Sequence, residues 1–122
     1  MVKRVLIVED EQDVAELVAD VLDLEGYETS TALGEDALQQ ALGFRPDVVL
    51  LDLMMPVVDG FEVARRLRRR DETRDIPIIV MTAMHDAPSR AAEVGTEYFL
   101  AKPFDIVELI GAVEQAEGMS AV

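Results

Sequence analysis

Carboxylate, hydroxyl and ammonium groups follow directly after short apolar segments at several points in this sequence. Glu9 and Asp10 follow the first such segment, Asp52 ends the second, Thr82 ends the third and Lys102 follows the fourth. If these segments are parallel strands, their carboxyl ends meet at one edge of a sheet, where α/β proteins place ligands and reactive groups. We therefore expect three carboxylates, one hydroxyl and one ammonium to converge there.

Clustered carboxylates favour a bound cation. The side chains of Glu9, Asp10 and Asp52 would repel one another at close range, and a hard divalent cation would relieve that repulsion. Mg²⁺ prefers oxygen ligands in near-octahedral geometry and keeps several waters. Asp10 and Asp52 are the natural direct ligands, the backbone carbonyl of Met54 is a candidate third ligand, and Glu9 would act through a bound water. Mg²⁺ is the predicted cofactor, because a calcium loop would need alternating acids that this stretch lacks.

A carboxylate beside Mg²⁺ can also attack phosphorus and form an aspartyl phosphate. Catalysis of phosphoryl transfer consists mainly of positioning the reactants and neutralising charge on the phosphoryl oxygens. Mg²⁺ can contact one of these oxygens and the Lys102 ammonium a second. The Thr82 hydroxyl and the backbone N–H of Ala83 can contact the third. Asp52, at the end of the most apolar segment, is the predicted nucleophile.

Each of these residues also has an ordinary structural explanation. Aspartate is a common turn residue at strand ends, and the β-branched Thr82 suits a strand. Lys102 alone would most often be a solvated lysine. The prediction therefore depends on their convergence rather than on any one residue.

Apolar segments alternate with helix-like segments along the chain. The predicted strands are 4–8, 27–32, 47–52, 78–81 and 98–101. The predicted helices are 12–25, 35–44, 60–70, 87–94 and 105–117. This alternation is typical of an α/β fold with a parallel sheet and helices on both faces. The apolar sides predicted to face the core in the first and last helices are Leu17, Val18, Val21 and Leu22, and Ile106, Leu109, Ile110 and Val113.

Composition limits the classes of protein that remain. The chain has 122 residues, of which 50% are hydrophobic and 30% are charged, so residues 1–122 are predicted to form one domain. It has no cysteine, which excludes disulfides, thiolate metal sites and cysteine nucleophiles. No apolar stretch reaches the length of a membrane span, and a cytoplasmic protein without membrane contact is expected. The net charge of −14 argues against nucleic acid binding by this chain.

Two features stand apart from the predicted site. Six arginines occur within residues 61–74, and they are interpreted as a solvated helix face, with a partner-docking patch as the alternative. His85 is the only histidine, and it is interpreted as an ordinary loop residue rather than a metal ligand or phosphoryl donor.

Five short motifs occur in order along the chain: Glu9-Asp10, Asp52 with Met55-Pro56, Asp59-Gly60, Thr82-Ala83 and Lys102-Pro103-Phe104. Together they resemble the receiver domain of two-component response regulators, and the resemblance covers essentially the whole chain. It implies a flavodoxin-like doubly wound fold with five helices and strand order 2-1-3-4-5. It also implies that Asp52 accepts a phosphoryl group from a phosphohistidine on a sensor histidine kinase or a histidine phosphotransfer protein.

The resemblance assigns further roles. Asp10 and Asp52 would bind Mg²⁺ with support from Glu9, Lys102 would contact the phosphoryl group, and the Lys102-Pro103 peptide bond would be cis. Thr82 and Phe99 are implied as a switch pair, in which the hydroxyl moves to the phosphoryl group and the ring fills the vacated space. The segment between Thr82 and Lys102 is shorter than the family pattern by about half a helical turn, which affects the face where a downstream protein target would dock.

Partner surfaces follow from the same resemblance. An output partner would dock on helix 87–94, strand 98–101 and helix 105–117. A kinase would dock on helix 12–25, with Val14 and Phe104 as candidate apolar contacts.

Three alternatives remain at this stage. A turnover enzyme such as an aspartate-nucleophile phosphatase would need an acid two residues after the nucleophile, where Met54 stands. A receiver-like interaction module that is never phosphorylated is a second alternative. The third concerns the chain rather than the chemistry, because the sequence is either a stand-alone receiver or a receiver from a longer transcription factor.

Overall fold

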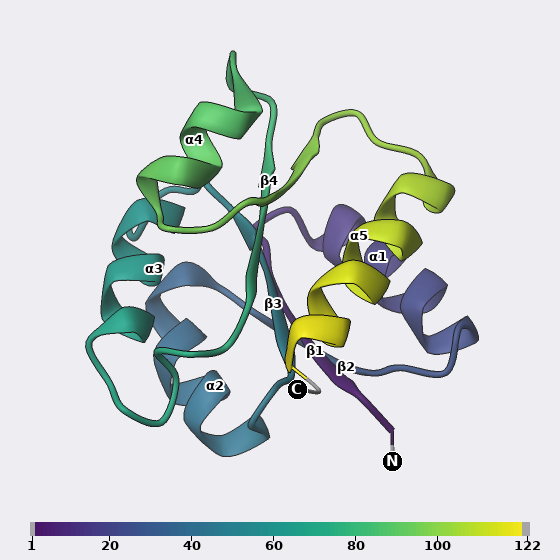
Figure 1. Ribbon diagram of the computed structural model, residues 1–122, viewed down its shortest axis with the longest axis horizontal. Helices are drawn as coiled ribbons and strands as arrows, with labels where there is room; N and C mark the ends of the chain where they lie inside the picture. The colour runs from purple at the N-terminus through teal and green to yellow at the C-terminus, as the bar shows by residue number, and fades with distance from the viewer. Residues whose placement is uncertain (1, 121–122) are drawn as a thin grey trace.

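The computed structural model describes residues 2–120, with side chains described through residue 118, and shows one parallel sheet between two layers of helices (Figure 1). The strands are β1 Arg4–Val8, β2 Glu28–Ala32, β3 Val48–Asp52, β4 Ile78–Thr82 and β5 Tyr98–Ala101. The helices are α1 Gln12–Leu24, α2 Ala37–Phe44, α3 Gly60–Arg68, α4 Ala87–Glu93 and α5 Ile106–Ser120, with a 3-10 turn, η1, at Gly34–Asp36.

The strand order is β2-β1-β3-β4-β5, and every neighbouring pair is parallel. This confirms the predicted flavodoxin-like, doubly wound α/β fold with strand order 2-1-3-4-5 and five helices. β3 lies at the centre, and all five of its residues are buried. The more polar β2 lies at one edge, as its composition predicted.

Helices cover both faces of the sheet, which is why the central strands are apolar on both sides. Alternate residues of β1, β3 and β4 pack towards α2, α3 and α4, and the intervening residues pack towards α1 and α5. In Figure 1 these two helical layers lie on opposite sides of the sheet, which is seen nearly edge-on. The two cores hold the strands in register, so their carboxyl ends form one edge.

The turn after β3 depends on two residues near the start of α3. The Asp59 side chain accepts a hydrogen bond from the Glu62 N–H at 2.9 Å and so caps the helix. The Gly60 N–H donates to the Leu53 carbonyl at 3.1 Å. A β-carbon on Gly60 would lie only 2.6 Å from the Leu53 Cα and would also meet the Asp52 carbonyl, so glycine is required for α3 to start this close to β3.

Two residues predicted to face the core do not. Leu17 on α1 is 63% exposed and Ile106 on α5 is 56% exposed, whereas Val18 and Leu109 on the same helices are buried. The prediction for Leu17 and Ile106 was wrong, because each lies at the margin of its helix's apolar side.

Two backbone features lie in the segment that leads to α5. The Lys102-Pro103 peptide bond is cis, as the resemblance implied. Helix α4 has seven residues, with Pro88 in its first turn. Within residues 2–120, no helix combines the length and apolarity needed to cross a bilayer.

Candidate functional site

The carboxyl edge of the sheet brings the predicted site residues together. Glu9 and Asp10 come directly after β1, while Asp52 and Thr82 are the last residues of β3 and β4. Lys102 follows β5, and its backbone N–H donates to the Thr82 carbonyl at 2.8 Å, which ties the two strand ends together. The convergence expected from the sequence is therefore present.

The three carboxylates form a cluster. One oxygen from each of Glu9, Asp10 and Asp52 lies within 4.8 Å of the others. Glu9 and Asp52 are each only 3% exposed, and Asp10 is the most accessible of the three. Such an oxygen-only cluster could hold a metal ion, and its donor chemistry suits Mg²⁺ better than a softer metal.

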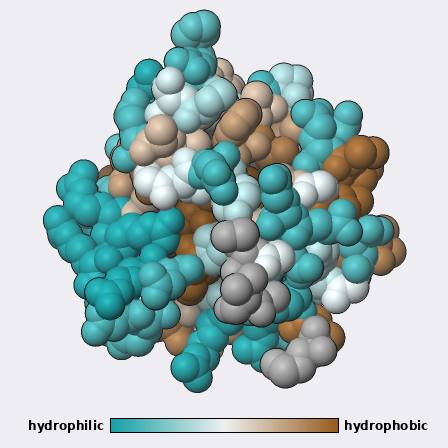
Figure 2. Space-filling model, viewed as in Figure 1, coloured by the Kyte–Doolittle hydropathy of each residue, from teal (hydrophilic) through white to brown (hydrophobic). Residues whose placement is uncertain are grey.

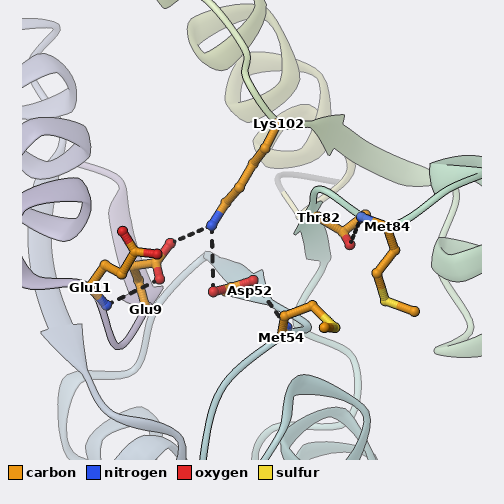
Figure 3. Close-up of polar contacts among 7 residues, drawn as sticks. All are labelled: Glu9, Glu11, Asp52, Met54, Thr82, Met84 and Lys102. Carbon is orange, nitrogen blue, oxygen red and sulfur yellow. Dashed lines mark hydrogen bonds and ion pairs between the residues drawn. The ribbon is translucent and has the colours of Figure 1, made fainter.

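Lys102 supplies the cation that partly neutralises this cluster. Its Nζ lies 2.8 Å from Glu9 Oε1 and 3.5 Å from Asp52 Oδ2 (Figure 3). Burial acts to lower the pKa of Lys102, but the hydrogen bond that its ammonium donates to Glu9 and the charges of Asp52 and Glu9 outweigh it, so the pKa is raised above 10.5. The ammonium is therefore charged at neutral pH and aimed at the acidic cluster.

The two Asp52 carboxylate oxygens have different partners. Oδ1 accepts a hydrogen bond from the Met54 backbone N–H at 3.1 Å, and Oδ2 faces Lys102. In Figure 3 the Asp52 side chain lies between Met54 and Lys102. These contacts restrict rotation of the carboxylate and hold both oxygens at the open edge of the sheet.

Glu9 is held from two sides as well. Oε1 contacts Lys102, and Oε2 accepts a hydrogen bond from the Glu11 N–H at 3.3 Å. Sequence reasoning assigned Glu9 to a water-mediated metal contact and missed its direct pairing with Lys102. The available signal was the additional methylene of glutamate, which extends the Glu9 carboxylate towards Lys102 at the same edge of the sheet.

Thr82 ends β4 at the same edge as the cluster, and Phe99 lies on the neighbouring strand β5. Thr82 is fully buried, and its Oγ1 accepts a hydrogen bond from the Met84 N–H at 2.9 Å. Figure 3 shows this pair apart from the contacts of Lys102. Phe99 stands opposite Val80 in the sheet register and is 40% exposed. Ala83, whose N–H was predicted to contact a phosphoryl oxygen, is exposed immediately after β4.

An apolar groove of about 360 Å³ lies next to the site, between α1 and the segment after β5. Lys102 lies at its border, so the groove leads to the acidic cluster. Its lining includes both residues that the sequence suggested for kinase docking, and it also includes Leu17, whose exposure is thereby explained. The apolar lining consists of Val14, Leu17, Val18, Ala83, Pro103 and Phe104.

Comparison with known proteins agrees with the fold. The family model described as the response regulator receiver domain matches residues 5–114. The DNA-binding dual master transcriptional regulator RpaA of Synechocystis is 37% identical over 90% of this chain and 47% of its own length. The chain spans about half the length of the curated relatives that it matches first.

Two solved structures are similar over nearly their full length. The chemotaxis response regulator CheY4 of Vibrio cholerae has a TM-score of 0.87 and 32% identity, covering 95% of this chain and 99% of that one. The receiver domain of sensor histidine kinase PA1611 from Pseudomonas aeruginosa, solved with a magnesium ion in its active site cleft, has a TM-score of 0.86 and 29% identity, covering 97% of this chain and 99% of that one. Sequence, family model and three-dimensional similarity agree, and this chain belongs to the receiver domain family of two-component response regulators.

Proposed function

We propose that Asp52 is the phosphoacceptor of this receiver and that its phosphorylation depends on Mg²⁺. The observation that carries the proposal is the position of the Asp52 carboxylate, buried at the sheet edge between the Lys102 ammonium and the carboxylates of Glu9 and Asp10. A lone carboxylate at a strand end would need neither a cationic partner nor a second pair of acids. An electrophile that brings its own negative charge, together with a metal cation, accounts for all four groups.

The proposed reaction is a displacement at phosphorus. An Asp52 carboxylate oxygen forms a bond to the phosphorus of a phosphohistidine, and the P–N bond breaks. Its electron pair goes to the imidazole nitrogen, which takes up a proton. Lys102 moves its ammonium from the carboxylates to a phosphoryl oxygen, and the Thr82 hydroxyl and Ala83 N–H contact another.

Asp10, Asp52 and the backbone carbonyl of Met54 are the proposed Mg²⁺ ligands, with Glu9 in support. When bound, the ion would supply positive charge to the carboxylates and to the incoming phosphoryl group. The oxygen-only character of the cluster supports this assignment, as does the magnesium ion in the similar receiver domain of PA1611.

Phosphorylation is proposed to change the output face through Thr82 and Phe99. The Thr82 Oγ1 currently accepts a hydrogen bond from Met84, and the Phe99 ring is partly exposed. A phosphoryl group on Asp52 would draw the Thr82 hydroxyl towards itself, and Phe99 would turn into the space left behind. Because Phe99 has no hydroxyl, the signal to a downstream protein partner would depend on packing on α4, β5 and α5.

The phosphoryl donor is proposed to be a sensor histidine kinase or a histidine phosphotransfer protein that docks in the groove beside α1. The groove is apolar, is bordered by Lys102 and lies next to the acidic cluster. A donor helix that covers Val14 and Phe104 would therefore place its phosphohistidine near Asp52. We propose that the protein acts in the cytoplasm as a signalling module and not as a turnover enzyme.

The experiment that tests this function uses a small acyl phosphate as the donor, so no kinase is needed. The chain is incubated with acetyl phosphate, with Mg²⁺ or with EDTA, and its intact mass is measured. One added phosphoryl group that requires both Mg²⁺ and Asp52, with Asp52→Asn as the control, is the expected result. No added mass with either acetyl phosphate or a kinase would overturn the proposal and favour an interaction module that is never phosphorylated.

A further inference from the structure

Positive charge is distributed unevenly over this acidic chain. Asp and Glu number 25 against 11 Lys and Arg, yet residues 61–74 alone contain six arginines and three acids. Arg45, at the end of α2, lines a hollow together with one of these arginines, Arg70. We define the arginine surface as the side chains of Arg45, Arg65, Arg66, Arg69, Arg70 and Arg74.

The arginine surface lies away from the phosphorylation site. Helix α3 starts beside Asp52 and runs back along the sheet, so its last turn and the segment 69–77 lie near the start of β4. Figure 2 shows strongly hydrophilic side chains gathered on the left of the molecule, where Figure 1 places α3. A five-residue strand separates the two edges of the sheet by roughly 17 Å.

Contacts within the chain leave much of this surface's hydrogen-bonding capacity unused. The Glu62 carboxylate is shared by Arg65 at 2.7 Å and Arg66 at 3.0 Å. Arg70 pairs with Glu72 at 3.3 Å, and both side chains are about half exposed. Since each guanidinium carries five N–H donors, one local carboxylate cannot satisfy it.

Arg45 and Arg69 are the least engaged members of the surface. Both are exposed, and neither guanidinium makes a hydrogen bond or ion pair with another described residue. Arg68, by contrast, donates to the carbonyls of Arg74 and Ile76 at 2.7 and 2.9 Å, so its role is structural. For that reason Arg68 is excluded from the arginine surface.

Two hollows with partly apolar linings lie beside these cations. A hollow of about 450 Å³ between α2 and the segment after α3 has Arg45, Arg70 and Glu72 at its polar border. A second hollow, of about 430 Å³, lies between α3 and α4, with Phe61, Ala64 and Val94 next to Arg65 and Arg68. The apolar lining of the first hollow consists of Ala41, Leu42, Pro46 and Ile76.

The helix dipole explains only part of this arrangement. Cations near a helix C-terminus are stabilised by the dipole, which accounts for arginines in the last turn of α3. It does not account for the hollows beside them. Nor does it require arginine at position 45, where φ is 56° and ψ is 62° and where glycine is the usual residue.

We propose that the arginine surface and the hollow between α2 and the segment after α3 bind an acidic amphipathic peptide segment of a partner protein. Carboxylates match the planar fork of the guanidinium groups, and Glu62 and Glu72 show that these side chains already take carboxylate partners. Apolar residues of the same segment would occupy the hollow. The net charge of −14 opposes the docking of any anion, but a short peptide carries fewer negative charges than a nucleic acid and is repelled less by the rest of the chain.

The test uses the full chain and a fluorescent helical peptide in which glutamate pairs alternate with leucine pairs. A peptide of glutamate alone and a short DNA duplex serve as competing polyanions, and binding is measured by fluorescence anisotropy. Saturable binding of the glutamate–leucine peptide, at least about tenfold tighter than that of either polyanion, is the expected result. Binding should weaken with added salt and should be unchanged in Asp52→Asn, because the surface is separate from the phosphorylation site.

Three variants separate docking from folding. Arg45→Gly should weaken peptide binding about tenfold while the thermal midpoint stays equal or rises, because glycine suits the left-handed conformation. Arg70→Gln should also weaken peptide binding, and position 70 is not in the left-handed conformation. Arg90→Gln on α4, outside the arginine surface, is the matched control and should leave peptide binding unchanged. The proposal would be overturned if the glutamate–leucine peptide did not bind saturably or if DNA bound as tightly as that peptide. It would also be overturned if Arg45→Gly and Arg70→Gln bound the peptide as tightly as the wild type.

Discussion

The Lys102 ammonium lies nearer to Glu9 than to Asp52, at 2.8 Å from Glu9 Oε1 against 3.5 Å from Asp52 Oδ2. Glu9 is fully buried at its side chain, so this ion pair lies in a region of low effective dielectric. The contact between Lys102 Nζ and Asp52 Oδ2 is therefore the weaker of the two ion pairs. If Asp52 is the phosphoacceptor, as proposed, an incoming phosphoryl group would draw Lys102 mainly away from Glu9.

Removing charge from the acidic cluster should stabilise the metal-free protein. Asp10 is the most accessible of the three carboxylates, and no ion pair between Asp10 and Lys102 is present among the described residues. Asp10→Asn should raise the free energy of unfolding in EDTA by on the order of 0.5 kcal/mol, because one repulsive charge is lost. It should also abolish the additional stability that saturating Mg²⁺ gives the wild type. Urea denaturation with and without Mg²⁺ measures both effects, and a variant that still gains stability from Mg²⁺ would rule out Asp10 as a ligand.

Stability at alkaline pH should depend on Glu9. The folded-state pKa of Lys102 is raised above 10.5, despite opposing burial, chiefly because of Glu9. A raised pKa means that the stabilisation is fully present below about pH 10.5 and is lost as pH rises through the folded-state value. Glu9→Gln should therefore lose less stability than the wild type above that pH in EDTA.

Two tyrosines also make the protein lose stability as the pH rises into the alkaline range. The pKa of Tyr27 is raised by burial and by Glu117, and that of Tyr98 is raised by burial and by Glu97. The wild type and Glu9→Gln both retain these tyrosines, so the difference between their stability–pH profiles reports on the Lys102–Glu9 ion pair alone. Parallel profiles for Glu9→Gln and wild type would contradict the assigned role of Glu9.

Gly60 should be intolerant of a side chain. A β-carbon there would lie 2.6 Å from the Leu53 Cα, so Gly60→Ala must move α3 away from β3. We expect a loss of about 1–3 kcal/mol in the free energy of unfolding and slower phosphoryl uptake, because Asp52 is displaced. Gly43→Ala is the matched control, since its β-carbon meets nothing within 4 Å, and it should stabilise α2 by about 0.5 kcal/mol. Equal effects of the two substitutions would refute this account of the β3–α3 turn.

The groove beside α1 should matter for transfer from a protein donor and not for the chemistry. Val14→Arg would place a charge in the apolar groove and should slow transfer from a phosphorylated kinase by about tenfold. Uptake from acetyl phosphate should be unchanged. Leu24→Arg, on the same helix but outside the groove and already 87% exposed, should leave both rates unaltered. Unchanged kinase transfer in Val14→Arg would place the docking site elsewhere.

Much of the fold was predictable because its elements have strong local signals. β3 and β4 consist of apolar runs that are buried on both faces, and turn residues such as Asp59 and Gly60 follow β3. The carboxyl edge followed from topology alone, since parallel strands end on the same side. Asp52 and Lys102 could thus be placed together before any distance was known.

The remaining features depend on distances that sequence patterns do not contain. Helical periodicity could not distinguish Leu17 in a surface groove from a core residue, because both occupy the apolar side of α1. The pairing of Lys102 with Glu9 rather than Asp52 depends on differences of less than an ångström. The left-handed conformation of Arg45 was also missed, because glycine is the residue type that usually signals it.

The most direct test of the central claim is to identify the residue that carries the phosphoryl group. The chain is treated with acetyl phosphate and Mg²⁺, the acyl phosphate is reduced with borohydride so that the modified aspartate becomes homoserine, and peptides are sequenced by mass spectrometry. The account predicts homoserine at position 52 and nowhere else, with none formed in EDTA. Homoserine at position 10, or at no position while Asp52 is intact and Mg²⁺ is present, would contradict it.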